Sequence, residues 1–149
     1  MGKIRERLLN YSCVFLDTSV FIYHFEKNGS YFNITKEIFS RLDDKLGFSA
    51  VTSIISLLEL CVKPIKDSRD DLVEEYSQKL LYDQRLTTWM IDKEVVLKAA
   101  NLRATYAIKT PDAIQIATSI LGETEVFITN DKRLRIVNEI EVLILDDFL

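Results

Sequence analysis

The feature that most constrains the fold is a short, continuously apolar segment at residues 13–16 (CVFL), which ends directly at Asp17. A strand that faces water on one side alternates apolar and polar residues, whereas a strand buried on both faces of a parallel sheet does not. Four further short segments favour strands, at residues 48–51, 86–91, 126–128 and 142–145. Helical segments separate them, so we expect a three-layer α/β/α sandwich with a mostly parallel central sheet.

The spacing of apolar residues predicts helices over residues 20–26, 34–45, 54–62, 67–81, 93–107 and 110–122, and a short helix over 131–138. Ser19, Asp92 and Thr110 are the expected N-caps of three of these helices. Pro111 follows Thr110 in the first turn, where proline is favoured. Asn-Gly-Ser at residues 28–30 predicts a turn, and Pro64 is expected to end the helix over 54–62.

Length and composition predict a single domain over residues 1–149. Hydrophobic residues make up 48% and charged residues 28%, which argues against a disordered chain, and the net charge of −4 argues against a cationic protein that wraps nucleic acid. No run of about 18 apolar residues occurs, and residues 1–10 lack the apolar core of a secretion signal. We therefore expect no membrane span, a cytoplasmic location, and free thiols at Cys13 and Cys61.

Four carboxylates fall where the predicted strands end or where the following helices begin. Asp17 follows the first strand, and Asp131 comes a few residues after the strand at 126–128. Asp112 lies in the first turn of the helix that leads into that strand, and Glu59 lies in the second turn of the helix over 54–62. Sites in open α/β sheets lie outside the carboxyl ends of the strands, so we expect these four acids to converge.

Each acid also has a purely structural interpretation. Asp17 and Asp131 are good helix caps, and Asp112 complements the positive end of a helix dipole. Glu59 and Lys63 have the spacing of a surface ion pair on one helix. Against that interpretation, Glu59 lies in an otherwise apolar segment, where an unpaired charge is costly.

Taken together, the four acids indicate a metal site. Crowded carboxylates repel one another, and a divalent cation relieves that repulsion. Ligands that are all oxygen suit Mg²⁺ or Mn²⁺ rather than zinc, and the only histidine is His24.

Four segments resemble the motifs of PIN-domain nucleases, in the same order and with similar spacing. They are residues 14–22 (VFLDTSVFI), 52–60 (TSIISLLEL), 110–117 (TPDAIQIA) and 127–131 (FITND). The resemblance covers nearly the whole chain and implies a single PIN-like domain. Among free-standing chains of this size, the sequence is most similar to the VapC-type ribonuclease toxins of toxin–antitoxin pairs.

The resemblance implies an endoribonuclease that hydrolyses RNA phosphodiester bonds with one or two Mg²⁺ or Mn²⁺ ions. The metal-binding and catalytic acids would be Asp17, Glu59, Asp112 and Asp131, with supporting roles for Thr18, Ser19, Thr129 and Asn130. It also implies a homodimer and an antitoxin protein that lies across the acidic cleft. Residues 34–42 and 54–62 offer a candidate dimer surface.

One departure from the family pattern follows the fourth motif. Many VapC-type toxins carry another acid and an aromatic residue there, whereas this chain has Lys132, Arg133 and Leu134. The basic residues around the third and fourth motifs are candidates for binding the RNA backbone, with an ordinary solvated face as the alternative; they are Arg103, Lys109, Lys132, Arg133 and Arg135. Trp89 and Tyr106 are candidates for base stacking, with core packing as the alternative.

Three other functions compete with the nuclease. A catalytically inactive PIN-like scaffold would act through partners, but it has no need of all four acids. A phosphoacceptor receiver domain needs an acidic pair near its first strand, where only Asp17 stands. Nucleases that act on DNA or on special structures are usually longer than this chain.

Overall fold

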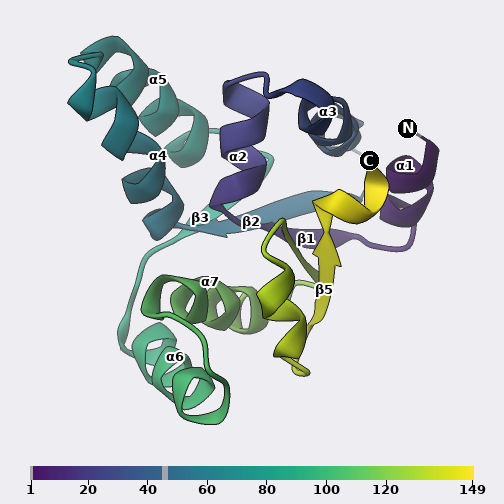
Figure 1. Cartoon of the computed structure of the whole chain (residues 1–149), viewed down its shortest axis with the longest axis vertical. Coiled ribbons are helices and arrows are strands. Elements are labelled where there is room, and N and C mark those ends of the chain that lie inside the picture. The colour runs from purple at the N-terminus through teal and green to yellow at the C-terminus, as the bar shows by residue number, and fades with distance from the viewer. Residues whose placement is uncertain (1, 45–46) are drawn as a thin grey trace.

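Five short parallel strands form the central sheet of the structure, a computed structural model that describes residues 2–44 and 47–149 (Figure 1). They are β1 (Cys13–Leu16), β2 (Ser49–Ser53), β3 (Leu86–Trp89), β4 (Val126–Thr129) and β5 (Glu141–Ile144). Their order is β3-β2-β1-β4-β5, and every neighbouring pair is parallel. The predicted α/β class and parallel sheet are confirmed.

Helices cover both faces of this sheet and complete the three expected layers (Figure 1). On one face lie α1 (Gly2–Leu8), α2 (Thr18–Phe25), α3 (Gly29–Asp43), α4 (Ile54–Lys66) and α5 (Asp70–Leu81). On the other face lie α6 (Lys93–Thr105) and α7 (Thr110–Leu121). Two short 3-10 helices follow the last two strands, η1 (Lys132–Ile136) and η2 (Leu145–Phe148).

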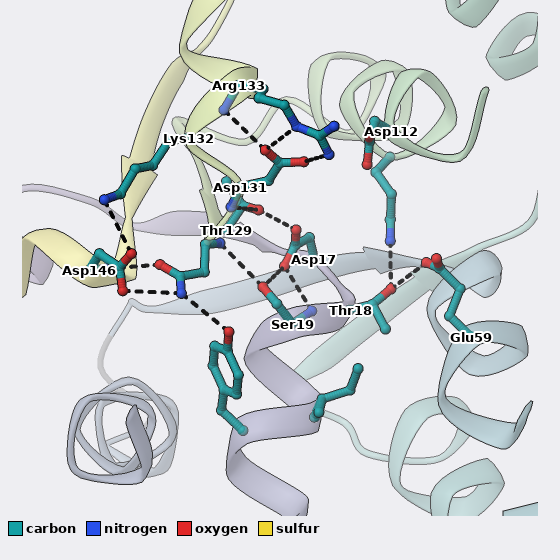
Figure 2. Close-up of a pocket in the computed structure, with 14 residues that line it drawn as sticks. Asp17, Thr18, Ser19, Glu59, Asp112, Thr129, Asp131, Lys132, Arg133 and Asp146 are labelled. Carbon is teal, nitrogen blue, oxygen red and sulfur yellow. Dashed lines mark hydrogen bonds and ion pairs between the residues drawn. The ribbon is translucent and has the colours of Figure 1, made fainter. Parts of the chain in front are cut away.

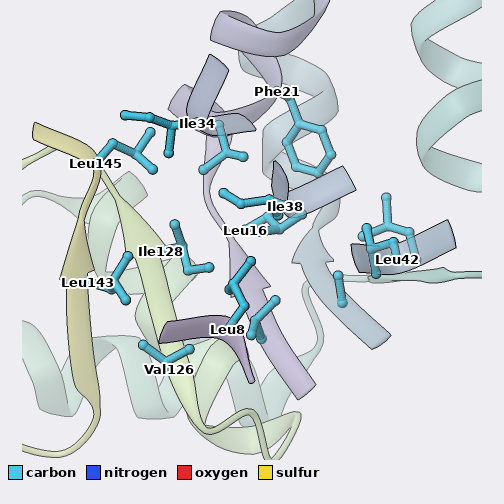
Figure 3. Close-up of a cluster of buried hydrophobic side chains, with 14 of the residues drawn as sticks. Leu8, Leu16, Phe21, Ile34, Ile38, Leu42, Val126, Ile128, Leu143 and Leu145 are labelled. Atoms are coloured by element: carbon cyan, nitrogen blue, oxygen red, sulfur yellow. The ribbon is translucent and has the colours of Figure 1, made fainter. Parts of the chain in front are cut away.

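The side chains of the central strands alternate between two hydrophobic cores. Leu16 and Ile128 point toward α1, α2 and α3, in the cluster that Figure 3 shows. Phe15 and Phe127 point the opposite way, toward α6 and α7, and their rings stack with centroids 5.0 Å apart. Both faces of these strands are buried, which explains why the segments are continuously apolar.

The strand order reverses between β1 and β4, which fixes the location of the site. After β1 the chain adds β2 and β3 on one side, and it then returns to add β4 and β5 on the other. Leu16 pairs with Ile128, and the amide of Asp17 donates to the carbonyl of Ile128 at 3.1 Å. The carboxyl ends of β1 and β4 therefore meet at a topological switch point, where open α/β sheets bind their ligands.

Helix starts differ from the predictions in two places. Asp17, rather than Ser19, is the N-cap of α2, and its carboxylate accepts the backbone N–H of Ser19 at 3.0 Å. Thr110 is the first residue of α7 rather than its cap, because Lys109 takes the N-cap position without a side-chain bond. Asp92 caps α6 as predicted, and its carboxylate accepts the N–H of Val95.

Several helices are longer or shorter than their apolar spacing predicts. Helix α4 continues through Pro64 to Lys66, because Pro64 lies near the end of the helix, where it costs one hydrogen bond and its ring is buried. Helix α3 begins at Gly29, inside the expected turn, and ends at Asp43; the predicted end at residue 45 lies outside the described residues. Helix α5 begins only at Asp70, and η1 is a 3-10 helix.

Helix α1 was not expected from the sequence. Ile4 and Leu8 are four residues apart and both are fully buried in the core where α1 contacts α3. Figure 3 shows Leu8 in this core. The strand predicted over 86–91 ends at Trp89, which packs against the core of α6 and α7. Core packing is therefore the role that the structure gives to Trp89.

The dimer surface predicted for residues 34–42 and 54–62 stays a prediction, but the structure limits which side chains of α3 it could use. Ile34, Ile38 and Leu42 are buried within the chain's own core, so they are not free to contact a second copy. On α4, by contrast, Leu58 and Val62 are exposed. Cys13 and Cys61 are free thiols, as expected. Over the described ranges, no helix is both long and apolar enough to cross a membrane.

The start of β1 is held by a charged side chain that directly precedes the neighbouring strand β4. The carboxylate of Glu125 accepts the N–H groups of Ser12 and Cys13 at 2.7 and 2.9 Å and the hydroxyl of Ser12 at 2.8 Å. Bonds from these donors, the Ser12 N–H first, lower the pKa of Glu125. This stabilisation is fully present above the pKa that Glu125 has in the unfolded chain, and it is lost as the pH falls through the lowered pKa of Glu125 in the folded chain.

We expect Glu125→Gln to lower the free energy of unfolding by about 1 kcal/mol at pH 7, because a neutral amide accepts these bonds more weakly. Urea denaturation at a series of pH values from 7 downward measures the effect. The difference between the two proteins should shrink as the pH falls through the lowered pKa of Glu125, because the native carboxyl then also loses its charge. A deficit that keeps the same size across the whole series would contradict this account.

Candidate active site

An open pocket of about 720 Å³ lies at the carboxyl ends of β1 and β4 (Figure 2). Helices α2, α4 and α7 each contribute side chains from their first two turns to the lining of this pocket. The residues that line the pocket are Asp17, Thr18, Ser19, Ile22, Tyr23, Glu59, Asp112, Gln115, Thr129, Asn130, Asp131, Lys132, Arg133 and Asp146. The four acids selected from the sequence are among them, so the structure brings them together.

Asp17 lies partly buried at the centre of the pocket floor (Figure 2). One of its carboxylate oxygens accepts both the N–H and the hydroxyl of Ser19, at 3.0 and 2.5 Å. The other accepts the hydroxyl of Thr129. Burial raises the pKa of Asp17 to about 6, although these hydrogen bonds act in the opposite direction. Asp17 therefore combines the helix-cap role with a place in the pocket.

Glu59 reaches the pocket from the second turn of α4. Its carboxylate accepts the hydroxyl of Thr18 at 2.6 Å. The predicted pairing of Glu59 with Lys63 is not what the structure has, since Lys63 pairs with Glu26 at 3.8 Å. The contact with Thr18, 41 residues earlier in the chain, orients Glu59 toward the other acids instead.

Asp112 enters from the first turn of α7, half-buried in the wall of the pocket (Figure 2). Burial is the largest cause that raises its pKa, followed by the negative charge of Asp131 and, more weakly, that of Glu59. Arg133 and Lys109 act in the opposite direction. The negative charges of two other pocket acids, Asp131 and Glu59, therefore disfavour the ionisation of Asp112.

Asp131 is bound tightly to a neighbouring cation. Arg133 donates to both of its carboxylate oxygens, from Nε at 3.0 Å and from Nη2 at 2.7 Å. The backbone N–H of Arg133 adds a third bond at 3.0 Å, which makes Asp131 the N-cap of η1. These contacts, the guanidinium first, lower the pKa of Asp131.

A second polar network closes the pocket on the side of η2. The backbone N–H of Asp146 donates to Asn130 at 2.9 Å, and Nδ2 of Asn130 contacts Asp146 at 3.3 Å and Tyr23 at 3.2 Å. The hydroxyl of Tyr31 also donates to Asp146, and Lys132 pairs with it at 3.4 Å. Asn130 thus ties the end of β4 to the end of β5.

The donor chemistry of the pocket fits a divalent cation. Its acids offer only oxygen atoms, and two of them, Asp17 and Asp112, are hard to ionise in the absence of a positive charge. Across residues 2–44 and 47–149, however, no three His, Cys, Asp or Glu side chains form a ready-made metal cluster. Mg²⁺ commonly binds through one or two carboxylates and keeps several waters, so a pair of acids meets its requirement.

The family model of the PIN domain matches residues 14–140. The chain belongs to the PIN domain family. PIN domains are nucleases that generally depend on divalent metal ions. No curated protein matches the sequence.

Solved structures with the same fold include toxin–antitoxin complexes. DNA-bound VapBC from Salmonella typhimurium aligns with a TM-score of 0.68 at 17% identity, covering 89% of this chain and 97% of that one. VapBC2 from Rickettsia felis, bound to a promoter DNA fragment, gives 0.68 at 15% identity, covering 88% and 97%. A toxin–antitoxin complex from Klebsiella pneumoniae gives 0.63 at 21% identity, covering 89% and 97%. At these identities the likeness establishes the fold.

The basic residues proposed for RNA binding divide into two groups in this PIN domain. Lys132 and Arg133 line the pocket, and Lys109 stands at the N-cap of α7 beside Asp112. Arg103 is elsewhere: it donates to the carbonyl of Ile108 at 3.1 Å and to the hydroxyl of Thr110, and so braces the loop between α6 and α7. Arg135 likewise does not line the pocket, and it pairs with Asp147 at 2.6 Å.

Four pocket residues were missed in the sequence: Ile22, Tyr23, Gln115 and Asp146. Asp146 directly follows the predicted strand over 142–145, so the rule that singled out Asp17 also applies to it. Gln115 is a polar residue in an apolar helix, three positions after Asp112 and thus on the same helix face. Both signals were present in the sequence. Nothing in the local pattern singles out Ile22 or Tyr23.

Proposed function

We propose that this PIN domain is a metal-dependent endoribonuclease that hydrolyses RNA phosphodiester bonds in the pocket of Figure 2. The observation that carries the proposal is the convergence of Asp17, Glu59, Asp112 and Asp131 on one pocket at the switch point of a PIN domain. The raised pKa of Asp17 and of Asp112 supports it, because a bound cation would remove the cost of ionising them.

Asp17 and Asp112 are the residues that would hold Mg²⁺ or Mn²⁺, with Glu59 and Asp131 completing the set of acids. Such an ion lowers the pKa of a bound water and turns it into a nucleophile near neutral pH. Ser19 and Thr129 hold the carboxylate of Asp17 in one orientation. Thr18 supports Glu59 in the same way.

Substrate binding would depend on the cations around these acids. Lys132 and Arg133 line the pocket and Lys109 stands at the N-cap of α7, so these are the cations that would contact an RNA backbone bound at the acids. In the free protein Lys132 and Arg133 are paired with Asp146 and Asp131. A phosphate would compete with those carboxylates for the two cations, so RNA affinity should fall as salt rises.

The proposed biological setting is a toxin–antitoxin pair. The three structural neighbours reported above are toxin–antitoxin complexes, which supports a VapC-type toxin with an antitoxin protein as partner. A homodimer and a cytoplasmic location complete this proposal.

A catalytically inactive PIN-like scaffold is the second candidate. The observation in its favour is that Arg133 occupies both carboxylate oxygens of Asp131, while the described part of the chain contains no ready-made three-ligand cluster. In a scaffold the acids would bind no metal. Metal binding therefore separates the two candidates before any RNA is tested.

The proposal is tested by incubating the purified protein with a mixed RNA pool in Mg²⁺, in Mn²⁺ and in chelator, beside Asp112→Asn. We expect cleavage that needs the metal and falls at least about 100-fold in the variant. Glu139→Gln serves as the control, because Glu139 pairs with Lys98 on the surface, outside the pocket. Absence of both cleavage and Mn²⁺ binding would establish the scaffold instead.

Arg133→Gln should tighten Mn²⁺ binding several-fold at low ionic strength, because it removes a cation that now neutralises Asp131 and acts on Asp112. The same change should raise KM for RNA, since a backbone contact is lost. Titration calorimetry at two salt concentrations measures the first effect. Arg5→Gln is the matched control, because Arg5 pairs with Glu37 outside the pocket. Weaker Mn²⁺ binding in Arg133→Gln would contradict the expectation.

A further inference from the structure

Below the pocket, a buried network of hydroxyl and amide groups joins α2, α4 and α7. Thr18, Ser56 and Gln115 are all more than nine-tenths buried. Nε2 of Gln115 lies 2.9 Å from the hydroxyl of Ser56 and 3.1 Å from that of Thr18. Thr18 in turn donates to Glu59 at 2.6 Å. A continuous chain of hydrogen bonds therefore runs from the interior of α7 to an acid of the pocket.

The hydroxyl of Ser56 donates its proton to Thr52, as the neighbouring hydrogen bonds require. The hydroxyl of Thr52 donates to the carbonyl of Leu16 at 2.7 Å, and a hydroxyl has only one proton to give. At the 2.9 Å contact between Thr52 and Ser56, the donor must then be Ser56. Toward Gln115, Ser56 can therefore act only as an acceptor.

The proton of Thr18 is committed in the same way, because it goes to the carboxylate of Glu59. Thr18 and Ser56 are thus two acceptors facing one side chain, and only the amide nitrogen of Gln115 can satisfy both. This fixes the orientation of the amide. Both of its protons are used, one on Thr18 and one on Ser56.

We propose that Gln115 is the positioning residue for Glu59, acting through Thr18. By donating to Thr18, Gln115 leaves that hydroxyl with one favourable direction for its own proton, toward Glu59. Without the amide, the Thr18 hydroxyl is free to turn to Ser56, whose oxygen lies 3.3 Å away. Gln115 is also one helical turn after Asp112, so α7 positions two of the four acids. The catalytic consequence rests on the proposed function, whereas the contact itself does not.

The other end of the Gln115 amide argues against a purely structural role. Its oxygen, Oε1, is buried and has no hydrogen-bond partner within the described residues. A buried acceptor without a partner destabilises the folded chain, so an apolar side chain of similar shape should be tolerated here. Gln115→Met is therefore expected to leave the thermal midpoint unchanged or slightly higher while it releases Glu59.

The test compares Gln115→Met, Thr18→Val and the double variant with the full-length wild-type chain. Two quantities are measured: the carboxyl ¹³C shift of Glu59 by NMR, and the affinity for Mn²⁺ by calorimetry. Each single change should move the Glu59 signal and weaken Mn²⁺ binding about tenfold, and the double variant should be no weaker than Thr18→Val alone. Thr18→Ser, which keeps the hydroxyl, should restore both values.

Thr118→Val is the matched control, since Thr118 is a buried residue of α7 whose hydroxyl bonds Ile114 within its own helix, outside the pocket. A Glu59 signal that stays at its wild-type position in Gln115→Met would overturn the proposal, as would effects on Mn²⁺ binding that multiply in the double variant. If the wild type neither binds Mn²⁺ nor cuts RNA, the proposed nuclease fails, and the Glu59 signal still decides whether Gln115 positions that side chain.

Discussion

Asp17→Asn is expected to lower RNA cleavage about 100-fold or more and, at the same time, to make the protein more stable. Burial raises the pKa of Asp17 to about 6 from its ordinary value of 3.8. At pH 7 the ionised carboxylate is therefore less favourable in the folded chain than in the unfolded one. The neutral amide should raise the free energy of unfolding by about 1–3 kcal/mol at pH 7, and it can still cap α2.

The gain in stability should depend on pH with a definite sign. As the pH falls from 7 through about 6, the folded wild type takes up a proton on Asp17 before the unfolded chain does. The cost of the buried charge then disappears, so wild type and variant should converge near pH 4. Urea denaturation across this range, in the presence of a chelator, measures the difference.

Asp71→Asn is the control with the opposite sign. Asp71 is exposed, and a hydrogen bond from Arg69 lowers its pKa to about 2, so removing its charge should bring no gain in stability. For cleavage, Asp17→Asn should lose about 100-fold or more, in line with the loss of one preorganised charged group from an active site. Full cleavage by the variant would exclude Asp17 from the site, whatever its effect on stability.

Such an opposition between stability and activity is typical of residues kept for function. The sequence singles out Asp17 for a separate reason. The strand before Asp17 is continuously apolar, and sites in open α/β sheets lie at the residues that follow such strands. The same rule located Asp131, and together the two acids define the end of the sheet at which β1 and β4 meet.

What the sequence could not provide are contacts that depend on tertiary structure. The spacing of Glu59 and Lys63 predicts an ion pair on one helix, but Glu59 contacts Thr18, which local spacing cannot reveal. Asp131 is the N-cap of a 3-10 helix and pairs with Arg133 two residues later, a spacing that brings no side chains together in an α-helix.

The predicted N-cap of α2 was wrong because the choice of cap also depends on tertiary contacts. Asp17 and Ser19 are both good capping residues and stand two positions apart, so propensity alone cannot choose between them. In the fold, Thr129 and Ser19 both donate to Asp17, which fixes its carboxylate at the helix end. Helix α1 was overlooked because only two apolar residues, Ile4 and Leu8, mark its buried face.

The largest loss of stability is expected for Phe127→Ala. Phe127 is fully buried in β4, and its ring stacks on Phe15 of β1 at 5.0 Å with the planes 8° apart. Removing the ring leaves a cavity between the sheet and the helix pair α6 and α7, at a cost of about 3–5 kcal/mol. For a chain of this length, that corresponds to a fall of roughly 10 °C in the thermal midpoint.

The position of Phe127 links this loss to the site, because Thr129, the partner of Asp17, lies two residues further along β4. Phe127→Leu fills most of the same space and should cost less than half as much. Leu9→Ala removes an exposed side chain and should change the free energy of unfolding by less than about 0.5 kcal/mol. Thermal and urea denaturation of the three variants checks this order. A loss below 1 kcal/mol for Phe127→Ala would mean that the strand pair β1 and β4 does not depend on the stacked rings, and that the switch point is held by its backbone hydrogen bonds.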